Sequence, residues 1–248
     1  MNLSTLKEYL WVLYGIVAIL LILGVSLLYD PIAQIQEAQI TAGLRTAVTL
    51  PTPLDLMIPL VPAAIIIYWY VFYGFLFFSY FYFAFIQREF RNSMVIAFAL
   101  VNFIAYAIYL VFTVQGPERI VTVTDIFSYQ ISRLYLGDTH YNCLPSLHGS
   151  TSLLTAYVIW RAKKQWGYIA WPTAIAIQVS TLLVRQHWIA DQIVAALVTI
   201  PIAYFVFDWF KYTKVTSEAV KIPWWKIAVS IGVAVCFMVL YIWAFYLI

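Results

Sequence analysis

Apolar runs of about 20 residues recur along almost the whole chain, and this pattern decides which folds are possible. A helix of that length is what crosses the hydrocarbon core of a bilayer. Hydrophobic residues make up 64% of the 248 residues and charged residues only 10%, which is too little charge to cover a water-soluble surface. The sequence therefore predicts an all-α integral membrane protein.

The runs predict one multi-pass domain over residues 1–248, a helical bundle of six to seven transmembrane helices. The first run lacks the short apolar core and the cleavage site of a signal peptide, so we expect it to remain as a span. The segment 30–55 is too polar to span, and it is either a short helix on the membrane surface or an ordinary loop. The predicted spans are 9–29, 57–85, 93–114, 145–164, 168–185, 187–210 and an extra C-terminal one at 223–248.

Two short polar stretches interrupt this apolar sequence, at 143–150 and 185–191. The first reads Cys-Leu-Pro-Ser-Leu-His-Gly-Ser and the second Arg-Gln-His-Trp-Ile-Ala-Asp, and together they contain two of the three histidines. Ionisable groups inside a membrane segment cost several kcal/mol unless they are paired, so such groups usually have a function. We expect the site within residues 115–194.

Lys and Arg residues are distributed unequally between the two sets of loops. With a cytoplasmic N-terminus, ten of the 14 lie on the cytoplasmic side and four on the other. Cytoplasmic loops are enriched in positive residues, so the count predicts this orientation. Both polar stretches then face the periplasmic, extracellular or lumenal side. The four basic residues on that side are Arg45, Arg119, Arg133 and Arg185.

His187 and Asp191 are four residues apart, which on a helix would place them on one face. The carboxylate could then accept a hydrogen bond from one imidazole nitrogen, fix the tautomer and leave the other nitrogen free. Such a pair serves either a nucleophile or a metal ligand.

The first stretch is predicted to open a helix with Pro145 at its first position. Ser146, Leu147 and His148 would then lie in the first turn, where free backbone N–H groups favour an anion. His148 could donate a proton to a leaving oxygen. Arginine binds phosphate oxygens well, and Arg119 and Arg185 are the candidates.

These residues resemble two signatures of the type 2 phosphatidic acid phosphatase superfamily. Pro145-Ser146-Leu147-His148 is similar to Pro-Ser-Gly-His, and the segment from His187 to Asp191 is similar to the His-x3-Asp part of Ser-Arg-x5-His-x3-Asp. The Leu147 variant is closer to the branch that contains the fungal inositol phosphorylceramide synthases. Gly116-Pro117-Glu118-Arg119 stands where the first signature of the family lies.

The resemblance implies that His187 attacks the phosphorus, Asp191 orients it and His148 protonates the leaving group. It implies no metal and no other cofactor. The arginine of the third signature would fall on Thr181, so Arg185 must supply that charge. The residues expected to bind the substrate phosphate are Ser146, Arg119, Arg185 and Gly149.

The expected function is hydrolysis of a lipid phosphate or lipid diphosphate, such as phosphatidic acid or a polyprenyl diphosphate. One alternative is a phosphotransferase that moves the headgroup of a phospholipid donor to another lipid, as in the synthase branch. Another is a transporter or channel, although the ionisable residues gather at one surface and not at the midplane.

The net charge and the remaining polar residues of the loops predict no further partner or site. A net charge of +3 is too small for a nucleic-acid partner. The sequence carries no signal for an oligomeric state. We expect a solvated loop that contains Asp138, His140 and Arg133. We expect Cys143 to be a small apolar residue where a helix begins.

Overall fold

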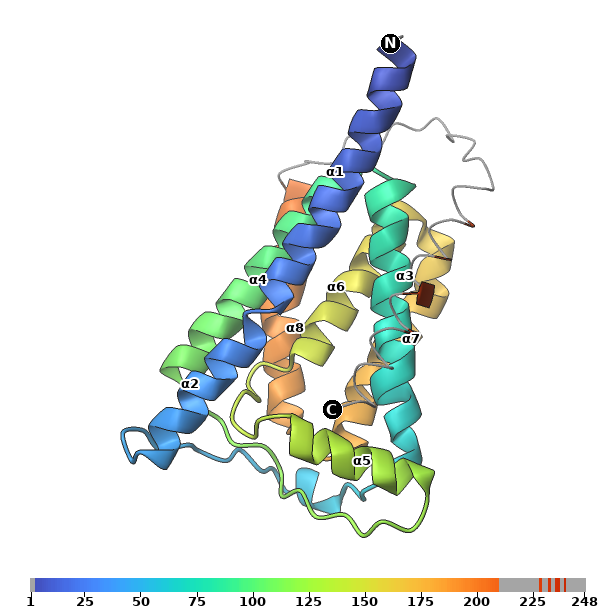
Figure 1. Ribbon diagram of the computed structural model, residues 1–248. Helices are drawn as coiled ribbons and strands as arrows, with labels where there is room; N and C mark the ends of the chain where they lie inside the picture. The colour runs from blue at the N-terminus through green and yellow to red at the C-terminus, as the bar shows by residue number, and fades with distance from the viewer. Residues whose placement is uncertain (1–2, 210–227, 229–231, 233–234, 237–238, 240–248) are drawn as a thin grey trace.

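The chain folds into a bundle of long helices that run up and down beside one another (Figure 1). A computed structural model describes residues 3–209 and residues 228, 232, 235, 236 and 239. The α-helices are α1 (Leu3–Ser26), α2 (Tyr29–Thr41), α3 (Phe72–Phe85), α4 (Arg91–Val111), α5 (Ile126–Gly137), α6 (Leu147–Ala162), α7 (Lys164–Leu183) and α8 (Ile189–Tyr204). Short helical turns are η1 (Asp55–Met57), η2 (Pro62–Ala64), η3 (Ile66–Val71) and η4 (Phe205–Trp209). Within these residues the fold is all-α, as predicted.

Four helical segments of the described chain are long and apolar enough to cross a membrane: Leu10–Thr41, Pro62–Phe85, Arg91–Val111 and Ile189–Trp209. They correspond to predicted spans at 9–29, 57–85, 93–114 and 187–210. The predicted spans at 145–164 and 168–185 form α6 and α7. The predicted span at 223–248 lies outside the described residues except for the five positions given above.

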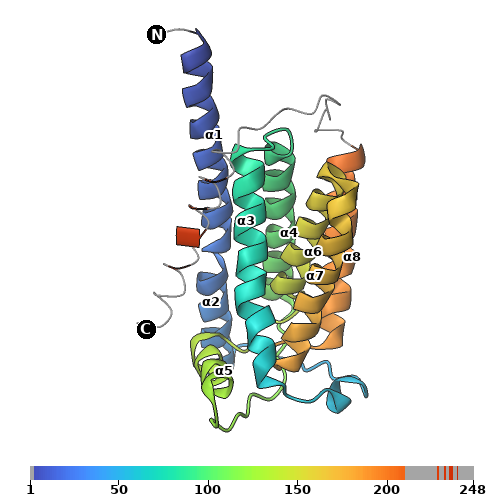
Figure 2. The ribbon, with the colours of Figure 1, turned by 90° about the vertical axis from the view of Figure 1, so that its right-hand side faces the viewer.

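The segment 30–55 divides into two parts. Residues Tyr29–Thr41 form α2, which continues along the direction of α1 after a break at Leu27 and Leu28 (Figure 2). The first part of the segment is therefore a helix of the bundle that continues the first candidate span. Its buried Gln36 donates from Nε2 to the Tyr109 carbonyl and to Thr113 Oγ1, which ties α2 to the end of α4. The remainder of the segment is a loop with one short turn, η1.

Helix α6 is the central helix of the bundle and packs against α3, α4, α7 and α8. Every residue from Gly149 to Val158 is buried. A helix that faces other helices needs small side chains more than apolar ones, and the hydroxyls of Thr151, Ser152 and Thr155 bond to carbonyls of their own helix. This explains why α6 contains many polar residues although it lies inside the bundle.

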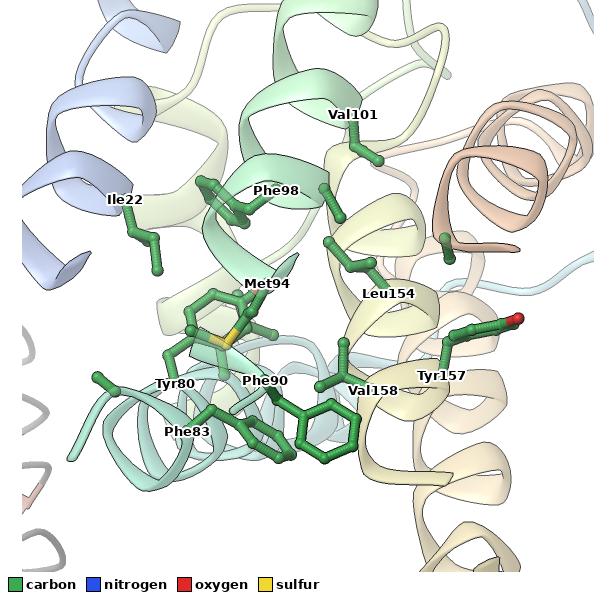
Figure 3. Packing of buried hydrophobic residues seen from close by; sticks show 14 of the residues in the cluster. Ile22, Tyr80, Phe83, Phe90, Met94, Phe98, Val101, Leu154, Tyr157 and Val158 are labelled. Atoms are coloured by element: carbon green, nitrogen blue, oxygen red, sulfur yellow. The ribbon is translucent and has the colours of Figure 1, made fainter. Parts of the chain in front are cut away.

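The apolar core lies between α1, α3, α4 and α6, and aromatic rings fill much of it (Figure 3). Phe90 packs against Phe83 and Phe207 with ring centroids 5.9 and 6.2 Å apart. Met94 and Leu154 are fully buried beside them. This core holds α6 in a fixed position, so that its first turn can form part of a site.

All the connections that carry the polar stretches meet at one end of the bundle, opposite to the beginning of α1 (Figure 1). Helix α5 lies across this end, and its start is fixed by a capping box between Asp125 and Ser128. Nearby loops pair through two isolated bridges that join Val48 to Val114 and Val114 to Asn142. The end of the bundle is therefore closed by an ordered layer, which the polar interval 115–142 had not predicted.

Candidate active site

The position of His187 depends on the first turn of α8. Its Nδ1 lies 3.2 Å from Asp191 Oδ2, so the pair predicted from the sequence does form. The reason is different from the predicted one. Helix α8 begins only at Ile189, and His187 precedes it outside any helix, next to the extended N-cap residue Trp188. The two residues therefore do not share a helix face.

Asp191 makes this contact because it caps its own helix. Its Oδ2 accepts the backbone N–H of Trp188 at 2.8 Å, the N-cap position of α8. A carboxylate at the third helical position commonly bonds back in this way and is favoured by the helix dipole. Asp191 is 0% exposed and His187 8%, so the pair is shielded from water. The cap thus brings the carboxylate to the imidazole.

Asp55 also stabilises the start of α8, from a segment far away in the chain. Its Oδ1 accepts the backbone N–H of Ile189 at 2.8 Å. Its Oδ2 accepts the backbone N–H and the hydroxyl of Thr52, which holds the loop in place. Free N–H groups at a helix start need such partners. Sequence reasoning missed Asp55, because nothing in its local sequence connects it with α8.

The first turn of α6 lies directly against the start of α8. Ser146 is the N-cap of α6, and its Oγ accepts the N–H of Gly149 at 3.1 Å. The helix therefore begins at Leu147, and Pro145 precedes it instead of occupying its first position. The backbone N–H of Ser146 donates to the Asp191 carbonyl at 3.2 Å. The two polar stretches are thus joined by a hydrogen bond.

His148 lies in the first turn of α6, and its ring packs against η3 and the beginning of α3. Its ring stacks on Tyr68, with centroids 4.4 Å apart, and lies 4.3 Å from the ring of Phe72. Its centroid is 6.2 Å from that of His187. The two histidine rings are therefore close neighbours, and the aromatic rings of Tyr68 and Phe72 fix the plane of His148.

Arg119 is fixed beside the residue that precedes His187. One guanidinium nitrogen donates to Gln186 Oε1 at 2.6 Å and to Asp138 Oδ2 at 3.4 Å. The other donates to the Asp138 carbonyl at 2.7 Å. Tyr29 of α2 in turn donates its hydroxyl to Asp138 Oδ1 at 3.1 Å. A chain of hydrogen bonds therefore runs from α2 to the α7–α8 connection.

Asp138 is consequently no solvated loop residue. Burial raises the pKa of its carboxyl group, and the neighbouring Arg119 and the Tyr29 hydroxyl oppose this effect only in part. Asp138 also forms an ion pair with Arg119, whose Nη2 lies 3.4 Å from Asp138 Oδ2. The pair fixes the position of the guanidinium group beside the α7–α8 connection.

Gln186 is a further residue that sequence reasoning did not assign. It is 2% exposed, and its amide orientation follows from chemistry, because a guanidinium group has only donors and must face the amide oxygen. The Nε2 group therefore points elsewhere, and it has no hydrogen-bond partner within the described chain. It is a buried donor next to His187. The sequence could have indicated a role for Gln186, because this residue directly precedes His187.

Arg185 has the left-handed backbone conformation, with φ at 52°. Only glycine adopts this region without cost, and other residues found there often lie at functional sites. The turn ends α7 and directs Gln186 and His187 toward α8, with the Gln186 N–H bonded to the Thr181 carbonyl at 3.0 Å. Both Arg185 and Arg119 lie within electrostatic reach of Tyr135. The side chain of Arg185 makes no hydrogen bond or ion pair to the described residues.

Gly149 allows α6 and α8 to approach each other closely. A Cβ at this position would overlap Gln192 Oε1 and lie 3.3 Å from Ala195 Cβ. Gln192 is anchored by a 2.7 Å hydrogen bond from its Nε2 to Thr181 Oγ1. Thr181, where the family signature has an arginine, thus holds the glutamine that packs on Gly149.

Cys143 lies beside His187, with its thiol within 4.8 Å of a ring nitrogen of the histidine. Burial raises the pKa of its thiol well above the usual range, so the thiol is protonated and is a poor nucleophile. With His187 and Asp191 it forms a group of three residues whose side chains could hold a metal ion within the described chain.

The close approach at Gly149 predicts that Gly149→Ala will separate α6 from α8. We expect a loss of about 1–3 kcal/mol of stability, as is usual for overpacking, and lower turnover. Thermal denaturation in detergent and hydrolysis of a phosphate ester measure the two effects. A second change, Gln192→Ala, should restore part of both.

Gly24→Ala is the matched control, because no atom lies within 4 Å of the added methyl group. Gly24 lies in α1, where alanine is favoured over glycine by about 1 kcal/mol, so stability should stay the same or rise. Wild-type stability and turnover in Gly149→Ala would contradict the close packing.

Comparison with known proteins finds one similar protein and one matching family. The chain is 32% identical over 134 residues to an uncharacterised protein of Methanocaldococcus jannaschii, an alignment that covers 53% of this chain and 55% of that protein. The chain therefore matches about half the length of this relative. No solved structure gives a significant match. Residues 60–205, more than half of the chain, match the PAP2 superfamily, so the protein belongs to this family of phosphatases and phosphotransferases.

Proposed function

We propose that the protein hydrolyses a phosphate ester or diphosphate of a membrane lipid through a phosphohistidine at His187, without a metal. The observation that carries the proposal is the contact of His187 Nδ1 with the buried carboxylate of Asp191 at 3.2 Å. Nδ1 donates its proton to that carboxylate, and Nε2 keeps a lone pair for attack on phosphorus. The carboxylate also stabilises the positive charge that the ring acquires.

His148 is proposed to act on the leaving group. Attack by Nε2 breaks the bond between phosphorus and the lipid oxygen, and His148 donates a proton to that oxygen. In the second step His148 takes a proton from water, which attacks the phosphohistidine and releases phosphate. The separation of 6.2 Å between the two ring centroids supports these roles, because it is short enough for both rings to act on one phosphate ester.

Donors for the phosphoryl oxygens come from three elements of the site. Arg119 supplies positive charge, the Ser146 hydroxyl can donate a proton, and Gln186 Nε2 is a buried donor without a partner in the described chain. Fixed donors of this kind stabilise the charge that develops on the oxygens in the transition state. Arg185 and the N–H groups that begin α6 add further positive potential.

We expect His187→Ala to abolish turnover and any acid-labile phosphoenzyme, because it removes the nitrogen proposed to attack phosphorus. Asp191→Asn should lower turnover by about 10²- to 10⁴-fold, since an amide neither fixes the tautomer nor stabilises the charged ring. Labelled lipid phosphate with quantification of free phosphate and of new lipid products measures both effects. The same assay distinguishes hydrolysis from transfer to a second lipid.

The third histidine provides the control. His140 bonds to the Pro117 carbonyl at 2.7 Å, and His140→Gln should keep most of the turnover. Vanadate, which imitates the five-coordinate transition state, should inhibit, and chelators should not. Normal turnover in His187→Ala would exclude the phosphohistidine.

His148→Ala should behave differently from His187→Ala. It removes protonation of the leaving oxygen but leaves the nucleophile in place. Turnover of a lipid phosphate should fall by about 10²- to 10⁴-fold, whereas a nitrophenyl ester, which needs no protonation, should lose much less. Equal losses on both substrates would contradict the role of His148 as the acid.

The active site is proposed to face away from the cytoplasm. Arg161, Lys163 and Lys164 lie where α6 meets α7, at the end of the bundle opposite to the site. Positive residues favour the cytoplasmic side. Cysteines introduced at Leu136 on α5 and at Lys164 in a Cys236→Ser background test this orientation. An impermeant thiol reagent should label the first in intact cells and the second only after permeabilisation, and the reverse result would contradict the proposal.

A further inference from the structure

Three potential metal ligands meet within the proposed active site. Cys143 Sγ, a ring nitrogen of His187 and a carboxylate oxygen of Asp191 lie within 4.8 Å of one another, and all three residues are buried. Cys143 comes from the loop before α6, His187 from the α7–α8 connection and Asp191 from the first turn of α8. The hydrolysis proposed above uses His187 and Asp191 but not Cys143.

The carboxylate of Asp191 has an unused oxygen in this place. Oδ2 accepts from His187 and Trp188, but Oδ1 has no hydrogen-bond partner in the described chain although Asp191 is fully buried. A buried acceptor without a donor costs about 1–3 kcal/mol, and native structures rarely tolerate it without a ligand. The vacant acceptor is thus independent support for a bound cation or proton.

Cys143 is also held in place for such a contact. An added Cβ at Gly116 would lie only 2.9 Å from Cys143 Sγ, so the missing side chain at Gly116 gives the sulfur its space. Within the described chain the thiol donates its hydrogen bonds to carbonyl oxygens, those of Gln186 at 3.6 Å and His140 at 3.8 Å. These are weak hydrogen bonds, and a metal could replace them at little cost.

We propose that Cys143, His187 and Asp191 bind Zn²⁺ and that the bound ion inhibits the enzyme. Thiolate, imidazole and carboxylate are the donor set of zinc sites, whereas Mg²⁺ and Ca²⁺ prefer oxygen ligands alone. Zinc bonds of 2.0–2.3 Å place tetrahedral ligands about 3.5 Å apart, so the side chains need to move by about 1 Å. A water molecule would fill the fourth position.

The inhibition follows from the ligands that the ion takes, and this part of the inference rests on the proposed function. Binding releases the thiol proton of Cys143, and when Nδ1 is the ligand the proton of that nitrogen moves to Nε2 of the neutral ring. Coordination through Nδ1 breaks the hydrogen bond to Asp191, and coordination through Nε2 consumes the attacking lone pair. In either case His187 can no longer act as a nucleophile.

Cobalt binding tests the site without reference to activity. The purified full-length protein in detergent is titrated with Co²⁺, whose bond to a thiolate gives a charge-transfer absorption in the near ultraviolet. Wild type and Cys236→Ser, the control at the other cysteine, should show the band at one ion per chain. Cys143→Ser and Cys143→Ala should not show it, and Zn²⁺ should displace it in wild type. A band of equal strength in folded Cys143 variants would overturn the inference.

Inhibition is then measured with Zn²⁺ and reversed with a chelator. Cys143→Ser should hydrolyse substrate as wild type does without metal, but the zinc concentration for half-inhibition should rise at least about tenfold, or about 1.4 kcal/mol in binding. Equal zinc sensitivity in both proteins would overturn the inference and leave the phosphohistidine untouched. Activation by zinc that requires Cys143 would instead retain the metal site and overturn metal-independent hydrolysis.

Discussion

The arrangement of the site depends on one buried carboxylate that has two tasks. Asp191 Oδ2 caps α8 through the N–H of Trp188 and contacts His187 Nδ1 at the same time. The direction of the imidazole is therefore coupled to the residue at which α8 begins. The Asp191 carbonyl also accepts the N–H of Ser146, so α6 is coupled to the same turn. Local helix capping, which many proteins use for stability alone, here positions the groups proposed for catalysis.

A second dependence links the site to the outer helices. Tyr29 reaches Asp138, Asp138 holds Arg119, and Arg119 holds Gln186, so four segments distant in the sequence share one network. Such a buried network is stable only when its members are satisfied, and it makes their positions specific. Asp138 and Gln186 fix the position of Arg119, which is proposed to bind the substrate phosphate. The helices at the periphery thus help to position a proposed phosphate-binding residue.

The sequence could predict what depends on composition and local spacing, but not what depends on distant contacts. Apolar length predicted the spans, and their number predicted that both polar stretches meet at one end. The His187–Asp191 contact was predicted for the wrong reason, because a helix start and a helix face give the same spacing of four residues. Asp55 and Asp138 looked like loop residues, since their partners Ile189 and Arg119 are identified only by the fold. Helix α5 was not predicted, because a helix of 12 residues is too short to span a membrane and its apolar residues only cover the end of the bundle.

Unpartnered polar atoms are concentrated in the segments that build this end of the bundle. Eight buried side-chain atoms there have no hydrogen-bond partner in the described chain: Arg119 Nε, Thr139 Oγ1, Asn142 Nδ2 and Oδ1, Ser150 Oγ, Gln186 Nε2, Asp191 Oδ1 and Gln192 Oε1. In an ordinary core each would cost about 1–3 kcal/mol, so selection for stability alone would remove them. A phosphate group would offer several acceptors to the donors, and a cation would satisfy the Asp191 oxygen. The atoms without protein partners therefore gather where the substrate and the metal are proposed to bind, and this location supports both proposals.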